Sequence, residues 1–318
     1  AITYSQDSST TPYHQGDSDV TITATFSESI RSTVLPKIKI TGDTISDVPL
    51  TQMVRINATE FTYTYTIPSG TGTGTIELHT ATDFAGNVVT TTPTSGATFS
   101  VNNTKPSMAI TADWINSGQT TNVTSSTVTF TSSEATSDFD VNDVIVKKDG
   151  VEVTGRLNSF NSTSDSVYTC AFTTDGNATY TIEVSAGSYT GNVSGNTNTV
   201  SNIFEWTFDT IAPTMVITAK AIDASGANVD NLTTNDATLF LTFTSSQGIA
   251  AGTFSTTSDI TVIGGIISNT LMVNPTTFTA IFTPNAPSAP ATTTSCSIVV
   301  PAGAYNDLAG NSTDADSN

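Results

Sequence analysis

Two copies of a short acidic turn sequence contain the residues best suited to chemistry in this chain. They read Asp83-Phe84-Ala85-Gly86-Asn87 and Asp307-Leu308-Ala309-Gly310-Asn311. Asp and Gly at this spacing suit a tight turn, in which the carboxylate accepts backbone hydrogen bonds and the glycine takes positive φ. The same carboxylates are oxygen ligands of the kind that Ca²⁺ prefers. A degraded copy, Asn192-Val193-Ser194-Gly195-Asn196, has an amide in place of the acid and an extra Gly191 before it, which favours the structural role.

A second set of carboxylates lies near the Asp209–Pro213 linker. Asp209 precedes the proline, and Asp230 follows it by less than twenty residues. Carboxylates that meet at a junction between domains would bind Ca²⁺ and stiffen the junction, because the ion needs six to eight oxygen ligands. We therefore predict that any bound calcium lies at a junction, held by Asp209 with Asp230 or Asp307, and that Asp83 is a further candidate. No Asp-x-Asp-x-Asp-Gly sequence supports this, so the structural alternative stays open.

Catalytic chemistry has little support in this sequence. There are only two histidines, His14 in a polar loop and His79 beside Glu77, which does not favour a Ser-His-Asp triad or a histidine metal centre. Trp206 lies in an alternating strand and is expected in the core, while Trp114 lies in a loop and is the better candidate for stacking on a carbohydrate. We predict that the chain is not an enzyme.

Glycosylation sequences and cysteines say more about environment than about mechanism. Eight Asn-x-Ser/Thr sequences occur, about as many as chance predicts in a chain that is one-third Ser and Thr. The candidate acceptors are Asn57, Asn102, Asn122, Asn161, Asn177, Asn192, Asn231 and Asn311. Cys170 and Cys296 fall on apolar faces of different strands, so both are expected to be buried and unpaired.

The elements that must position these residues are β-strands. The turn copies recur roughly every 105 to 115 residues, which is the length of one Ig-sized sandwich. Strict alternation at 61–67, 168–172 and 278–282 indicates strands with one buried and one wet face. We predict an all-β protein of three tandem Ig-like domains, 1–104, 105–211 and 212–318, in an elongated array. The side chains expected in its cores are Phe26, Phe130, Phe243, Tyr63, Phe172 and Phe282.

Charge limits the partners. The net charge is −19, from 28 acidic and 9 basic residues, so phosphate backbones and anionic membranes would be repelled. No run of apolar residues is long enough to span a bilayer, so membrane insertion is not expected. Acidity that is spread evenly over a polar surface keeps a long molecule soluble.

The repeats resemble a known family. The shared Thr-Phe strand ends, the sequence Asp259-Ile260-Thr261-Val262, the segment from Pro301 to Asn311 and the Asn-Thr-x-Pro linker are similar to tandem bacterial Ig-like (Big-type) repeats of large surface or secreted proteins. The resemblance covers the whole chain. It implies a structural spacer or stalk in an extracellular fibre or adhesin at the cell surface. The alternatives are an adhesive module for a glycan or protein, or a filament subunit.

The third repeat has no counterpart of the strand at 204–208 that closes the second repeat. A sandwich without its closing strand exposes an edge and an apolar slot. We therefore expect that slot to be filled, either by residues that follow Asn318 or by a strand from a neighbouring chain. The expected partners are further copies of the repeat, in cis or on a neighbouring chain.

Overall fold

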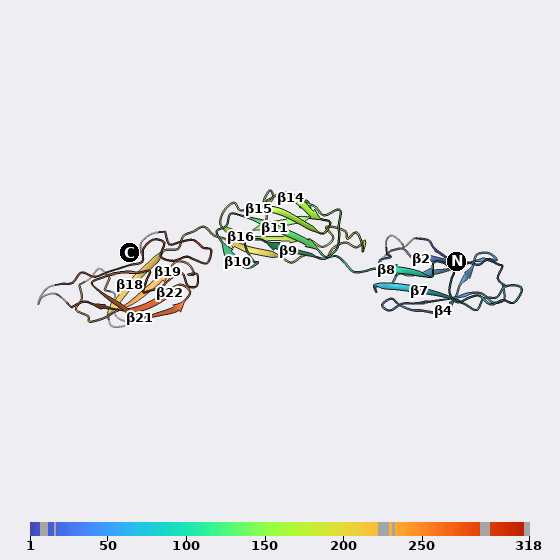
Figure 1. Ribbon diagram of the computed structural model, residues 1–318, viewed down its shortest axis with the longest axis horizontal. Helices are drawn as coiled ribbons and strands as arrows, with labels where there is room; N and C mark the ends of the chain where they lie inside the picture. The colour runs from blue at the N-terminus through green and yellow to red at the C-terminus, as the bar shows by residue number, and fades with distance from the viewer. Residues whose placement is uncertain (7–11, 16, 222–228, 231–232, 287–292, 315–318) are drawn as a thin grey trace.

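The computed structural model describes residues 1–6, 12–15, 17–221, 229–230, 233–286 and 293–314. Three β-sandwiches follow one another in a row, joined by short linkers (Figure 1). Each predicted domain boundary falls in one of these linkers, and the boundaries themselves stay predictions. Apart from a three-residue 3-10 helix at Val141–Asp143, the described residues form strands, turns and loops. No described helix has the length and apolar character needed to cross a membrane.

The first domain packs two four-stranded sheets face to face. Their strands, in sheet order, are β1 (Ile2–Tyr4), β2 (Val20–Thr25), β6 (Glu60–Tyr65) and β5 (Val54–Arg55), then β4 (Val48–Gln52), β3 (Lys37–Thr41), β7 (Gly72–His79) and β8 (Thr98–Val101).

The second domain repeats this arrangement with one added strand that pairs in parallel with its last strand. The sheets are β14 (Leu157–Ser164), β15 (Val167–Thr173), β11 (Ser125–Ser132) and β9 (Met108–Ala112), then β10 (Gln119–Thr121), β17 (Phe204–Phe208), β16 (Ala178–Val184), β12 (Val144–Lys148) and β13 (Val151–Glu152).

The third domain has one full sheet and one short sheet among its described residues. They are β18 (Met215–Ala221), β19 (Leu239–Ser245), β22 (Thr277–Pro284) and β21 (Gly265–Asn274), then β20 (Thr261–Ile263) and β23 (Ser297–Val299). Within the described residues nothing pairs with β23 as β8 pairs with β7 and β17 with β16. The source of a closing strand therefore stays a prediction.

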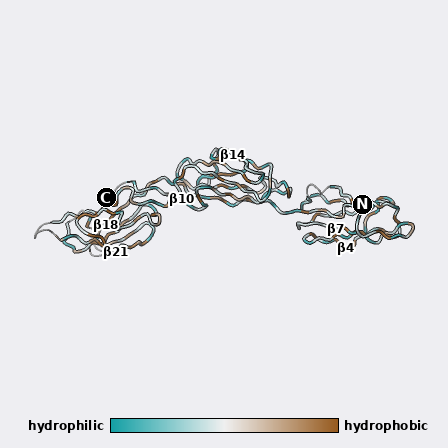
Figure 2. Tube along the Cα trace, viewed as in Figure 1, coloured by the Kyte–Doolittle hydropathy of each residue, from teal (hydrophilic) through white to brown (hydrophobic). Residues whose placement is uncertain are grey.

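The strand order defines the fold. If the strands β1 to β8 of the first domain are lettered A, B, C, C′, D, E, F and G in chain order, its sheets have the orders A-B-E-D and C′-C-F-G. The second domain adds β10 as an A′ strand beside its G strand, β17. This is the Greek-key arrangement of an Ig-like sandwich, so the predicted fold class is confirmed. The two-layer packing follows from alternating burial along the strands: every second residue of β16 is buried. Hydrophobic and hydrophilic residues interleave along all three domains (Figure 2).

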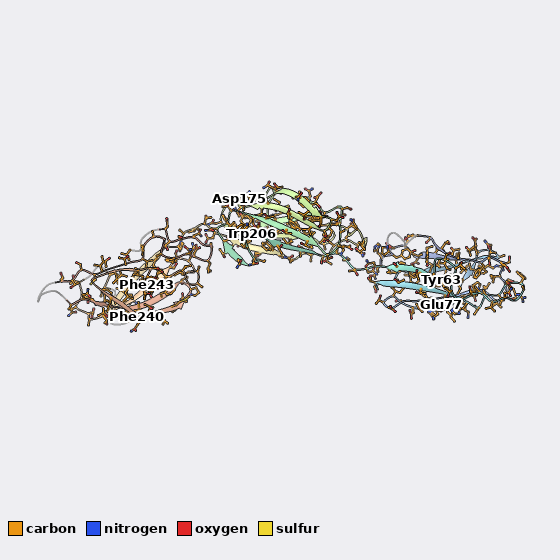
Figure 3. All side chains as sticks on the ribbon, in the orientation of Figure 1. Tyr63, Glu77, Asp175, Trp206, Phe240 and Phe243 are labelled. Carbon is orange, nitrogen blue, oxygen red and sulfur yellow. The ribbon has the colours of Figure 1, made fainter. Side chains whose placement is uncertain are left out.

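Each domain has its own core. Counted over the described residues, the first two cores contain 18 buried apolar residues each, and the third contains 9. Four of the six predicted core aromatics are buried, namely Phe130, Phe172, Phe243 and Phe282. Trp206 is buried in the second domain as predicted (Figure 3).

The prediction was wrong for Phe26 and Tyr63, which are only partly buried. For Phe26 the cause is a shift of two residues along the second strand of the first domain. Ile2 pairs with Ala24, whereas Ile110 pairs with Phe130, so Ala24 and not Phe26 is the counterpart of Phe130. Phe26 lies just beyond β2 and packs edge-on against Phe61, with ring centroids 5.7 Å apart.

The two cysteines also differ in exposure. Both are free thiols, but only Cys170 is buried. Burial raises the pKa of the Cys170 thiol to about 11. Cys296 is exposed, against expectation, because it lies one residue before β23 begins and contacts the carbonyl of Gly264 at 3.4 Å instead of the core.

Candidate functional site

The repeated acidic turn is built around a carboxylate that binds its own asparagine. In the third domain Asp307 Oδ1 accepts the backbone N–H groups of Ala309, at 2.9 Å, and Asn311, at 2.8 Å. Asp307 Oδ2 accepts the side-chain amide of Asn311 at 3.0 Å. In the first domain Asp83 makes the equivalent bonds to Asn87 N, at 2.8 Å, and Asn87 Nδ2, at 2.6 Å. The result is an asparagine amide held in a fixed direction.

Charge and backbone conformation both support this turn. Hydrogen bonds from Asn87 hold the pKa of Asp83 below its usual range, because they stabilise the ionised carboxylate. Gly86 and Gly310 have φ of 96° and 92°, a region that suits glycine and strains other residues. The Asp-x-x-Gly-Asn spacing is therefore explained by local hydrogen bonding.

The second domain makes the same turn with a carboxylate from elsewhere in the chain. Gly191 occupies the position of Asp83 and Asp307, since it makes the same two backbone bonds: its N–H donates to Asn196 and its carbonyl accepts from Gly195. A Cβ added to Gly191 would lie 1.3 Å from Oε1 of Glu134. The Glu134 carboxylate thus occupies the space of the missing acid.

Glu134 bonds the turn from outside it. Its Oε2 accepts the backbone N–H of Ser194 at 3.2 Å, and its Oε1 accepts the Ser194 hydroxyl. The sequence comparison of the repeats placed Asn192 at the acidic position and treated Gly191 as the insertion. The structure shows the reverse: Asn192 is the inserted residue, and its side chain accepts a hydrogen bond from Ser137 at 3.1 Å.

In the second and third domains the asparagine amide reaches the linker that comes before the domain. Asn196 Nδ2 donates to the carbonyls of Asn102, at 2.9 Å, and Thr104, at 3.0 Å. Asn311 Nδ2 donates to the carbonyls of Asp209, at 3.0 Å, and Ile211, at 3.3 Å. Both linkers are therefore bound at the same two positions.

A second bond at each junction joins the turn to the preceding domain directly. The Ser194 carbonyl faces Nε2 of His14, which must donate because a carbonyl only accepts. The equivalent carbonyl of Ala309 accepts the backbone N–H of Asn122 at 3.0 Å. His14 and Asn122 are counterparts, since each follows the residue that pairs in parallel with the end of the last strand. At the second junction Asn122 Nδ2 also donates to Asn311 Oδ1 at 3.0 Å.

The linkers are shaped to receive these bonds. The side chain of Asn102 accepts the N–H of Thr104 at 2.9 Å, and the side chain of Asp209 accepts the N–H of Ile211 at 2.9 Å. These are Asx turns, and each presents two carbonyls to the amide of the next domain. The proline that follows, Pro106 or Pro213, is buried in both cases.

The three copies of the turn differ in exposure as this arrangement requires. Ser194 and Ala309 are 1% and 8% exposed, because the preceding linker and domain cover them. Their counterpart in the first domain, Ala85, is exposed, and so is Asn87. The asparagine turn is thus a junction element where a described domain precedes it, and an uncovered polar surface in the first domain.

The four carboxylates predicted to bind calcium do not form one cluster. Asp83 and Asp307 hold their own turns, Asp209 bonds Ile211 and Asn177, and Asp230 Oδ1 accepts the N–H of Ala219 at 2.6 Å. At one junction the Asn311 amide donates both to the backbone carbonyl of Asp209 and to the carboxylate of Asp307. No group of three or more His, Cys, Asp or Glu side chains placed to hold a metal occurs in the described part of the chain. Calcium binding stays a prediction.

The candidate glycosylation sites fall into different surroundings. Asn57 and Asn161 are exposed, whereas Asn122 and Asn311 bond one another at the second junction. Asn231 lies outside the described residues. The remaining candidates, Asn102, Asn177 and Asn192, all have side chains that accept hydrogen bonds from neighbouring residues. Glycosylation at any of these positions stays a prediction.

One group of side chains has the composition of a catalytic triad but not its geometry. Asp17 lies 3.3 Å from Nδ1 of His14, and Nε2 of that ring faces Ser194. The ring nitrogen meets the serine carbonyl as a donor, however, and the serine hydroxyl donates to Glu134. The histidine therefore cannot take the hydroxyl proton, and the group is a junction contact.

Trp114 is 75% exposed and borders a cavity of about 10 Å³, which is room for about one water molecule. The cavity does not have the size of a ligand pocket.

Comparison with known proteins gives likenesses of low identity. No protein-family model matches the chain, and no curated protein matches it. Among solved structures it is similar to a titin I-band fragment, at 13% identity and a TM-score of 0.34, over 100% of this chain and 97% of that one. It is similar to invasin, a bacterial integrin-binding protein, at 13% identity and a TM-score of 0.29, over 94% of this chain and 56% of that one. It is also similar to the N-terminal part of the bacterial S-layer protein SbsC, at 15% identity and a TM-score of 0.23, over 45% of this chain and 41% of that one. The chain therefore spans less than two thirds of the invasin and S-layer structures.

Proposed function

We propose that this chain is a spacer segment of an extracellular fibre or adhesin at a cell surface, built of tandem Big-type Ig-like domains. In this role the domains hold a distal module at a set distance, and the asparagine turns fix the angle between successive domains. Three domains of ordinary strand length give a rod of about 120 Å.

The observation that supports this proposal is the identity of the two junctions. Asn196 and Asn311 bind equivalent linker carbonyls, and the carbonyls of Ser194 and Ala309 bind equivalent residues of the preceding domain. Two independent joints with the same bonds favour a geometry that the sequence specifies. A freely jointed chain would need no such pattern.

The strength of a junction can be estimated from its bonds. Each contains about three hydrogen bonds between the turn and the preceding linker or domain, and each net bond contributes about 0.5–1.5 kcal/mol. A junction therefore resists reorientation by about 2–4 kcal/mol. A resistance of this size keeps most molecules in one orientation.

The test is small-angle X-ray scattering on the full chain at low concentration, with the double variant Asn196→Ala/Asn311→Ala. The matched control is Asn87→Ala, which removes the same asparagine from a turn that no described domain precedes. We expect the wild type and the control to give the same maximum dimension. The double variant should give a broader distribution of interdomain distances, with unchanged circular dichroism.

The proposal fails if the wild type already scatters as a freely jointed chain, or if the double variant scatters as the wild type does. In the first case the domains are not a rod. In the second the asparagine amides do not set the angle between domains, so the junction bonds no longer support a spacer.

A further inference from the structure

We infer that strand β21 of the third domain is a pairing edge through which two copies of this chain associate side by side. β21 is the last strand in its sheet, and no described residue pairs with its outer edge. It is ten residues long, whereas natural edge strands are usually short, charged or covered. Figure 1 shows it at the border of the third domain.

The side chains on this edge are apolar and exposed. Ile266, Leu271, Met272 and Val273 are 63%, 62%, 53% and 56% exposed. Three of them, Leu271, Met272 and Val273, are consecutive, and an exposed apolar strip of this kind on an otherwise polar protein marks an interaction site or an aggregation liability.

The equivalent strand of the second domain shows that this strip is not a requirement of the fold. Strand β14 pairs with β15 as β21 pairs with β22, and both carry the same bulge, with positive φ at Ser159 and at Asn269. Matching the strand partners aligns Leu157 with Ile267, because they pair with Phe172 and Phe282.

With this register every exposed apolar residue of β21 has a polar counterpart. Arg156 stands where the third domain has Ile266, and Asn161, Ser162 and Thr163 stand where it has Leu271, Met272 and Val273. On the next two strands inward, Ile281 of β22 and Phe240 of β19 stand where the second domain has Ala171 and Thr127. Figure 3 shows Phe240 on the β21 side of the domain.

The distribution of charge points to a second copy of this chain as the occupant. The chain carries a net charge of −19, so two copies repel one another over most of their surface. Residues 260–306 contain no Asp, Glu, Lys or Arg, and β21 lies inside that segment. Two copies that meet at this edge bring together segments that carry no charged side chains of their own. An edge strand also pairs naturally with itself in the antiparallel sense, which closes a two-fold dimer.

Sedimentation velocity on the full chain from about 1 to about 500 µM tests this inference. We expect a reversible monomer–dimer equilibrium that strengthens with salt, since salt screens the repulsion between the acidic surfaces. The triple variant Leu271→Asn/Met272→Ser/Val273→Thr copies the second domain's edge onto the third. It should weaken association by about tenfold or more without changing the melting temperature of the monomer, measured at a concentration where the wild type does not associate, because the replaced side chains are exposed.

A matched control makes three polar changes on β14, Asn161→Ser, Ser162→Asn and Thr163→Ser, and should dimerise as the wild type does. Hydrogen exchange then locates the contact: the amides of 265–274 should become protected as the concentration rises. A wild type that stays monomeric over the whole range would overturn the inference, as would an unaffected triple variant. Protection confined to β23 would overturn it in favour of strand exchange at the short sheet. Binding of the wild type, but not the triple variant, to phosphatidylcholine vesicles would assign the strip to lipid instead.

Discussion

The exchange of carboxylates in the second domain makes the sharpest prediction, because it can be tested by a double-mutant cycle. In that domain Glu134 supplies the charge that Asp83 and Asp307 supply in the others, and Gly191 leaves the space for it. Glu134→Ala removes both hydrogen bonds to Ser194. Bonds to a charged group contribute about 1.5–3 kcal/mol each, and partial exposure of Glu134 reduces this, so we expect a loss of about 2 kcal/mol.

The second single change, Gly191→Asp, restores an acid to the turn while Glu134 is still present. In Gly191→Asp the new Cβ would lie only 1.3 Å from Oε1 of Glu134, so the two side chains clash. The change also brings two carboxylates together. Overpacking of this kind costs about 1–3 kcal/mol, and the repulsion between like charges adds to it. The backbone itself tolerates the change, because Gly191 is not among the glycines with positive φ.

The double variant Glu134→Ala/Gly191→Asp should be far more stable than the sum of the two changes predicts. With the Glu134 carboxylate removed, the introduced aspartate has room to accept the turn's N–H groups, as Asp83 and Asp307 do. We expect the double variant to lose about 1 kcal/mol, whereas the two single losses sum to about 4–5 kcal/mol. The difference is a coupling of about 3–4 kcal/mol, while independent sites add to within about 0.5 kcal/mol.

Denaturant unfolding followed by tryptophan fluorescence measures this coupling in one domain. The two tryptophans, Trp114 and Trp206, both lie in the second domain, so their signal reports on it alone. Strict additivity of the two changes would refute the equivalence of Glu134 with the turn aspartates.

Four further predictions concern groups that the structure places in contrasting surroundings. Cys296 should react with a thiol reagent in the native state, while Cys170 should react only on unfolding, because it is buried and its pKa is raised to about 11. The wild type should be more stable than Asp83→Asn at neutral pH, and this difference should disappear as pH falls below about 4, because the pKa of Asp83 is lower in the folded state than in the unfolded state. Calorimetry of both proteins at a series of pH values measures the difference. A chelator should lower the melting temperature if the predicted carboxylates bind calcium, and an unchanged melting temperature would contradict calcium binding. In a glycosylating host, mass spectrometry should find the exposed Asn161 modified and Asn311 unmodified, because a glycan on Asn311 would replace an N–H that binds the preceding linker.

Much of the fold could be predicted because it follows from a local rule. Period-two alternation identified the strands at Tyr168–Phe172 and Phe278–Phe282, and these strands carry the cores. The same rule failed at Phe26, because a Thr-Phe pair also ends β2 but lies two residues further along the ladder than in the other domains. A shift of two keeps the alternation intact, so no pattern in the sequence alone reveals it.

The site was recognisable in sequence, but its role was not. The spacing of Asp and Gly-Asn predicted a hydrogen-bonded turn, and Asp307 and Asn311 form one. The junction bonds join Asn196 to Asn102 and Asn311 to Asp209, which lie about a hundred positions apart in the chain. In each bond the acceptor is a backbone carbonyl, which every residue has, so the sequence does not reveal the partner. One signal was present: both linkers begin with Asn or Asp two residues before the second bound carbonyl.

The degraded copy of the turn separates what the turn must keep from what it can vary. The second domain has lost the aspartate and gained an extra residue, yet its glycine and asparagine remain, and Asn196 binds the linker as Asn311 does. A turn kept only for its own stability would have no reason to keep the asparagine once the carboxylate came from Glu134, which lies in the loop after β11. A turn kept for calcium would have no reason to replace an acid by glycine. The feature common to both junctions is the asparagine amide bound to two equivalent linker carbonyls. In the third domain Asp307 also bonds this amide directly, whereas in the second domain Glu134 bonds the neighbouring Ser194.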